Sequence, residues 1–147
     1  MCVLNLGIPC TVSNGIVVST DDYINKLIAI NPGTKFVVLS LKLKEYDAET
    51  LRCFGLADIY NKIESPKYDV TFIIDEIPEG LGAVGCSALE KHIKDCGKNC
   101  ILFFKSVEDL DRYSITLDFT CFAEEDTNTG VWNLLYFEED CERNITV

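Results

Sequence analysis

Four side chains that can bind zinc lie close together in the second half of the sequence. They are Cys86, His92, Cys96 and Cys100. Thiolate sulfur and imidazole nitrogen are ligands that Zn²⁺ takes in structural sites, and residues 92 and 96 are one helical turn apart. The segment has no Cys-x-x-Cys pair, however, and Gly97 is expected to end the helix before the last cysteine. We therefore expect packed cysteines with an incidental histidine, and no bound metal or cofactor.

Gly80, Gly82 and Gly85 form the pattern Gly-x-Gly-x-x-Gly ahead of a predicted helix. In dinucleotide-binding sites such glycines let the backbone approach a pyrophosphate at the helix N-terminus. Here Ile77-Pro78-Glu79 separates the pattern from the preceding strand, and too little chain follows it for a complete dinucleotide-binding domain. The favoured interpretation is a flexible link between two units, and nucleotide binding is the alternative.

An acid pair, Asp75-Glu76, follows the apolar strand predicted to end at Ile74. Pairs of this kind hold magnesium in nucleoside triphosphatases. That chemistry also needs a phosphate-binding Gly-x-x-x-x-Gly-Lys-[Ser/Thr] loop, which the sequence lacks. The pair is therefore expected to be a solvated strand end.

Cys2 would become the N-terminal residue if Met1 were removed. A cysteine that uses its own α-amine as the base is a known catalytic device, and class II amidotransferases use it. Those enzymes usually continue Cys-Gly, whereas this chain continues with Val3. Because the single histidine, His92, completes no convincing Cys-His or Ser-His-Asp set, we expect no enzyme activity and name no catalytic residue.

The charges are numerous and unevenly distributed. With 24 acidic and 13 basic residues the net charge is −11, which argues against indiscriminate binding to nucleic acid or anionic lipid. The acids gather late in the chain, and the candidate partner-binding residues are Glu124, Glu125, Asp126, Glu138, Glu139 and Asp140. Several lysines instead fall on or beside the predicted helices, and these are Lys26, Lys91, Lys94 and Lys98. A solvated acidic loop and tail that maintain solubility are the alternative to a docking surface.

The eight cysteines could form four disulfides, but several lie within periodic apolar patterns where a reduced cysteine is a small buried hydrophobe. The N-terminal segment lacks the basic region of a signal peptide, and no apolar run is long enough to span a bilayer. We therefore expect an intracellular protein, in cytoplasm or nucleus, with reduced cysteines and no membrane partner.

Two short helices are expected to position these groups. The first begins after an N-cap at Thr20, and the second begins with the capping box Ser87–Glu90 and ends at Gly97. Strands are predicted in 15–19, 35–44, within 50–60, 68–74, 83–86, 100–107, 112–122 and 131–137.

This order repeats a strand, a short helix and further strands in residues 15–75 and 83–137. Two helices of three turns cannot cover both faces of a large parallel sheet. The sequence therefore predicts an α+β fold, in which a duplicated strand-helix-strands unit places two short helices on one face of a mostly antiparallel sheet. The length suits a single domain, residues 1–147.

The second half resembles a DNA sliding clamp of the proliferating-cell-nuclear-antigen type in the order of its elements. The resemblance covers residues 83–122, with the helix from Ser87 to Cys96, and the final strand followed by acids. It implies a duplicated domain with an acidic outside and helices that line a central hole. Lys26, Lys91, Lys94 and Lys98 would then contact DNA phosphates. A clamp subunit contains more than one such domain, so a ring of this chain would need roughly six copies.

The predicted function is that of a non-enzymatic binding protein resembling a single sliding-clamp domain. Its expected partners are another protein, further copies of itself and, if it is oligomeric, duplex DNA. One alternative is an acidic regulatory protein, of viral origin for example, that binds basic partner surfaces as a nucleic-acid mimic or host-factor binder. The other is a small hydrolase with Cys2 as its nucleophile.

Overall fold

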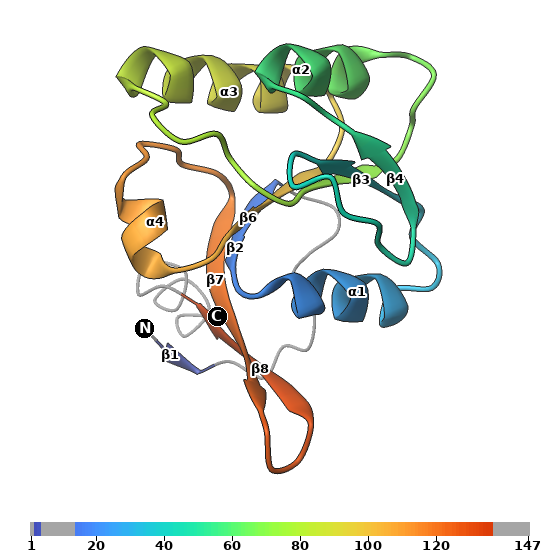
Figure 1. Cartoon of the computed structure of the whole chain (residues 1–147), viewed down its shortest axis with the longest axis vertical. Coiled ribbons are helices and arrows are strands. Elements are labelled where there is room, and N and C mark those ends of the chain that lie inside the picture. Colours follow the sequence, from blue (N-terminus) through green and yellow to red (C-terminus); the bar gives the residue numbers. More distant parts are fainter. Residues whose placement is uncertain (1, 4–13, 137–147) are drawn as a thin grey trace.

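The computed structural model describes residues 2–3 and 14–136 (Figure 1). Helices alternate with strands along most of this length. In chain order the elements are β1 (Cys2–Val3), β2 (Gly15–Val18), α1 (Asp21–Ala29), β3 (Phe36–Ser40), β4 (Glu49–Arg52), α2 (Leu56–Glu64), β5 (Thr71–Ile74), α3 (Ala83–Asp95), β6 (Cys100–Phe104), α4 (Val107–Asp111), β7 (Phe119–Asp126) and β8 (Val131–Tyr136). Among the described residues, none of the helices is long and apolar enough to cross a membrane.

The described strands form one sheet in the order β1-β8-β7-β2-β6-β5-β3-β4. Every neighbouring pair from β7 to β4 is parallel, and only β1–β8 and β8–β7 are antiparallel. The prediction of an α+β fold is confirmed, but the prediction of a mostly antiparallel sheet is wrong. Strands β2, β3, β5 and β6 are buried along their whole length, as is usual for parallel strands covered on both faces.

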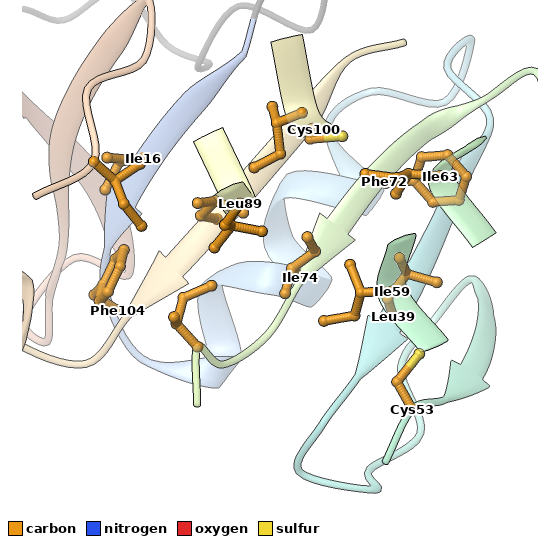
Figure 2. Packing of buried hydrophobic residues seen from close by; sticks show 14 of the residues in the cluster. Ile16, Leu39, Cys53, Ile59, Ile63, Phe72, Ile74, Leu89, Cys100 and Phe104 are labelled. Carbon is orange, nitrogen blue, oxygen red and sulfur yellow. The ribbon is translucent and has the colours of Figure 1, made fainter. Parts of the chain in front are cut away.

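Helices cover both faces of the sheet. Helix α1 packs through Tyr23, Ile24 and Leu27 against one face, where Val17, Val38, Ile73, Ile101 and Phe103 also lie. Helices α2 and α3 pack side by side on the other face (Figure 1). The core of that face includes Ile59, Ile63, Leu89 and Ile93, and Figure 2 shows part of it. The two helices expected on one face, α1 and α3, therefore lie on opposite faces.

Several local predictions differ from the structure for identifiable reasons. Strand β4 covers only the first residues of the range 50–60 predicted to contain the second strand, and helix α2 begins at Leu56, with its buried residues Ile59 and Ile63 at helical spacing. Helix α3 already begins at Ala83, so the strand predicted over 83–86 is wrong, and Ser87 lies inside the helix and does not cap it. Strand β7 begins only at Phe119. The alternating residues 113–117 before it form a loop, and Ile115 of that loop is buried in the core. Gly97 does end α3, with a left-handed φ of 72°.

The two segments 15–75 and 83–137 contribute interleaved strands. Strand β2 from the first segment lies between β6 and β7 from the second, at the centre of the sheet. Gly15 permits this close packing, since a Cβ there would lie 2.0 Å from the Phe119 ring. Each segment thus depends on the other for its place in the sheet.

Candidate functional site

The carboxyl ends of β2, β3, β5 and β6 meet at one edge of the sheet, which we term the carboxyl edge. In open parallel sheets with helices on both faces, ligands bind outside this edge, where connections leave in opposite directions. A small hollow of about 60 Å³ lies there. Its lining includes Lys42, Asp75, Glu76, Lys105, Asp109, Arg112 and Tyr113.

Asp75 is the most buried acid of this edge, with 2% of its surface exposed. Its carboxylate accepts hydrogen bonds from Ser40 Oγ at 2.6 Å, Leu41 N at 2.9 Å and Tyr46 Oη at 2.9 Å. Burial, followed by the Asp75 charge, raises the pKa of Tyr46, so the phenol remains a donor. The prediction of a solvated strand end is therefore wrong for Asp75, which ties β5 to the loop after β3.

The connection between β2 and α1 consists of Ser19 and Thr20 alone. The Ser19 hydroxyl donates to the Ala123 carbonyl at 2.7 Å, within the sheet. Asp21 occupies the first turn of α1, and its two carboxylate oxygens accept from Lys42 Nζ at 2.5 Å and Lys44 Nζ at 2.6 Å. Burial acts to raise the pKa of Asp21, but the bonds and charges of the two lysines outweigh it and lower that pKa overall.

Asp21, Lys42 and Lys44 occupy the N-terminus of α1, which is the position where parallel sheets of this kind often bind a phosphate. The helix N-terminus that would attract an anion carries a carboxylate of the chain itself, already neutralised by Lys42 and Lys44. The remaining cations of the edge also have carboxylate neighbours: Lys105 lies 4.0 Å from Glu76, and Arg112 lies 3.6 Å from Asp109. The positive charges of the carboxyl edge are thus paired with carboxylates of the same chain, and the connection from β2 to α1 contains no glycine-rich phosphate loop.

The glycine pattern follows β5 and opens α3. Gly80 has a φ of 75°, which glycine adopts without strain. A Cβ on Gly85 would lie 2.3 Å from Leu81 Cδ1, so this glycine lets Leu81 pack against the first turn of the helix. Backbone conformation and packing within the chain thus account for both of these positions.

The four candidate zinc ligands do not gather at one point among the described residues. The Cys86 thiol donates to the Leu81 carbonyl at 3.8 Å, while His92 Nδ1 pairs with the Glu64 carboxylate of α2. The His92 ring also stacks on Tyr60, with centroids 3.8 Å apart. Cys96 and Cys100 flank the turn after α3, and both pack in the same core cluster. No cluster of three or more potential metal ligands occurs within residues 2–3 and 14–136.

The four predicted DNA-facing lysines do not share one surface. Lys26 lies in the last turn of α1, whereas Lys91 and Lys94 lie on α3, across the sheet. Lys94 pairs with Glu90 at 3.2 Å, and Lys98 Nζ donates to the Ser65 carbonyl at 2.5 Å. The single lysine-bearing layer that the clamp resemblance implied is absent from the described part of the chain.

The acids Glu124, Glu125 and Asp126, here called the hairpin acids, end strand β7 and are all exposed. Figure 1 shows that the β7–β8 hairpin projects beyond the rest of the sheet. Asp126 Oδ1 accepts from Asn128 N at 2.9 Å and shapes the turn. None of the ion pairs among the described residues uses the hairpin acids. Glu138, Glu139 and Asp140 lie outside the described residues, as does the side-chain environment of Cys2.

Sequence patterns indicated the hairpin acids and the start of α1 after Thr20, but not the cluster around Asp75. Its signal was an acid directly after the three apolar residues Phe72–Ile74, with Ser40 ending another strand and Tyr46 in the loop that follows it. The contact of Asp75 with Ser40 and Tyr46 forms because β3 and β5 are neighbours in the sheet, and the sequence does not show that strand order.

Comparisons with known proteins add one structural similarity. No family model matches the chain, and no curated protein matches its sequence. Among solved structures, the chain is similar to the N-terminal domain of zonular occludens toxin from Neisseria meningitidis. The two are 13% identical, with a TM-score of 0.47, over 88% of this chain and 85% of the other.

Proposed function

We propose that this chain is a non-enzymatic binding protein that acts through protein–protein contacts, and that the hairpin acids dock a basic surface of its partner. The observation that carries the proposal is the projecting β7–β8 hairpin, whose three exposed carboxylates have no ion-pair partner among the described residues. Unpaired charges on a protruding element favour an encounter with an oppositely charged surface.

The carboxyl edge supports the non-enzymatic part of the proposal. Its lysines and acids neutralise one another, and the Ser19 hydroxyl, which could otherwise contact a ligand after β2, is bonded within the sheet. A nucleotide would have to displace Asp21 from both lysines before its phosphates could approach the helix N-terminus. Millimolar Mg-ATP is therefore expected to leave the thermal unfolding midpoint unchanged, and a clear rise would contradict the non-enzymatic assignment.

DNA contact through Lys26, Lys91, Lys94 and Lys98 is not part of the proposal. Two helices on opposite faces cannot present their lysines to one duplex, and Lys98 is engaged with Ser65. The net charge of −11 also opposes a dispersed basic surface.

The test replaces the hairpin acids by their neutral isosteres, Glu124→Gln, Glu125→Gln and Asp126→Asn, in one variant. The probe is a lysine-rich peptide, with binding measured by calorimetry at low salt. Three exposed ion pairs at about 0.5 kcal/mol each correspond to roughly tenfold weaker binding. The asparagine retains an acceptor for Asn128 N, so the turn should persist.

A matched control removes three exposed acids elsewhere, through Glu45→Gln, Glu49→Gln and Glu108→Gln. Both triple variants have the same net charge. The proposal expects the control to bind the peptide as the unaltered protein does. Equal weakening in both variants would assign the binding to net charge alone and contradict a hairpin site.

A further inference from the structure

Cys96 and Cys100 flank the turn between α3 and β6. Cys96 is the C-cap of α3, and Cys100 is the first residue of β6. Gly97, with its left-handed φ of 72°, reverses the chain between them. This turn brings the two thiols close enough for each to shift the pKa of the other, and both side chains pack in the same core cluster.

The two thiols have different environments. Cys96 is half-buried, and its sulfur also lies 3.2 Å from the Ile93 carbonyl and 3.6 Å from the Lys98 carbonyl. Cys100 is fully buried in the core shown in Figure 2. The neighbouring Cys100 thiol, then the backbone and charge of Lys98, lower the pKa of Cys96 to about 6 against the effect of burial. The Cys96 side chain and burial raise the pKa of Cys100.

We propose that Cys96 and Cys100 form a redox-active dithiol that hydrogen peroxide oxidises to an intramolecular disulfide. The Cys96 thiolate attacks one peroxide oxygen, the O–O bond breaks, and the products are a sulfenic acid on Cys96 and, after protonation of the departing hydroxide, water. Cys100 then attacks the Cys96 sulfur. The S–O bond breaks, a second water leaves with the Cys100 proton, and the S–S bond forms. Two thiols and one peroxide thus give one disulfide and two waters.

The remaining described cysteines are poorly placed for this reaction. Cys53 is 1% exposed, and burial raises its pKa to about 11. Cys86 and Cys121 are buried as well. Because thiolate character and access together govern cysteine oxidation, Cys96 is the reactive thiol of the described set, with Cys100 as its resolving partner.

Oxidation would alter the contact between α3 and α2. The Cys96 sulfur lies 3.2 Å from the Ile93 carbonyl at the end of α3, so a bond to Cys100 would form directly beside this helix end. The turn between the two cysteines carries Lys98, whose Nζ donates to the Ser65 carbonyl at the end of α2 and lies 5.7 Å from the Phe72 ring. The dithiol is thereby positioned to transmit its oxidation state to the helical layer.

The sequence permits a direct test on the full chain. Trypsin cleaves after Lys94, Lys98 and Lys105, which places Cys96 and Cys100 in separate peptides, 95–98 and 99–105. The reduced protein is treated with a small excess of hydrogen peroxide, its free thiols are alkylated, and the digest is analysed by mass spectrometry. The expected product is a disulfide-linked pair of these two peptides that a reductant separates.

Single variants distinguish the two roles. With Cys100→Ser, oxidation should stop at a Cys96 sulfenic acid that dimedone traps, whereas Cys96→Ser should leave Cys100 reduced at the same peroxide dose. Cys53→Ser is the matched control and should form the linked pair at the unaltered rate. The proposal is overturned if the unaltered protein forms a Cys96 sulfenic or sulfinic acid without the linked pair, or if Cys53 is alkylated as fast as Cys96. Both readings use the unaltered chain, so they hold even if a serine variant fails to fold.

Discussion

Asp75 illustrates how burial changes the meaning of a residue. From the sequence, the position of Asp75 in an acid pair after a strand suggests a solvent-exposed strand end or a metal ligand. In the structure its carboxylate accepts three hydrogen bonds from groups of the same chain. Those donors come from residues 40–46, about thirty positions earlier in the chain. The sequence shows the carboxylate and the candidate donors, but their contact depends on strand order. Its neighbour Glu76, in contrast, is substantially exposed.

Asp75→Ala should destabilise the protein by about 2–4 kcal/mol. The change leaves the Leu41 amide and the hydroxyls of Ser40 and Tyr46 without their acceptor in a buried site. Urea unfolding followed by circular dichroism measures the difference. Asp75→Asn, which keeps one acceptor oxygen, should cost less than the alanine variant.

Glu76→Gln provides the control, because this side chain is exposed and its cation lies at the limit of an ion pair. Its expected effect is below about 0.5 kcal/mol. If Asp75→Ala were as mild as Glu76→Gln, the Asp75 carboxylate would not be the structural tie described above.

At the scale of elements, capping residues and apolar runs predicted the helices and strands that are defined by residues close together in the sequence. The strand at Gly15, the helix after Thr20, the final strand and the stop at Gly97 were readable from capping residues and apolar runs. Helix α2 was missed because its short apolar stripe also fits a strand. The start of β7 was misplaced because residues 113–117 alternate as a strand does, although the chain there crosses the core as a loop.

The N-terminus of α1 should confer acid sensitivity. The pKa of Asp21 in the folded protein is below its ordinary 3.8, so the unfolded chain binds this proton more readily. The stabilisation is therefore complete above about pH 4 and is lost as pH falls through the folded-state pKa. Asp21→Asn should cost about 0.5–1 kcal/mol at pH 7, and the difference from the unaltered protein should shrink towards pH 3.

The measurement is urea unfolding at several pH values at fixed ionic strength. Asp22→Asn is the matched control, since Asp22 lies in the same turn, is exposed and is outside the pair with Lys42 and Lys44. An Asp21→Asn effect that stayed constant from pH 7 to pH 3 would show that the carboxylate charge is not what stabilises this helix end.

For the whole molecule, the mixture of helices and strands was predictable and the order of the strands was not. With α2 unrecognised, two helices are too few to cover a parallel sheet, and an antiparallel sheet follows. The buried strands Phe36–Ser40 and Cys100–Phe104 carry the opposite signal, continuous apolar runs that suit a sheet covered on both faces. Of the candidate partner site, the hairpin acids were predicted from composition, while their projection from the body depends on the pairing of β7 with β8.

A single sheet shared by two cores should make unfolding one cooperative event. Leu89 packs on the α2–α3 face, whereas Leu27 and the sole tryptophan, Trp132, belong to the α1 face. Leu89→Ala should cost about 2–5 kcal/mol and lower the unfolding midpoint equally by circular dichroism and by tryptophan fluorescence, because β2, β5 and β6 line both cores. Leu27→Ala should behave the same way from the opposite face. If Leu89→Ala shifted the circular dichroism transition while the Trp132 signal kept its original midpoint, the two faces would unfold independently, and the chain would contain two cooperative units in place of one.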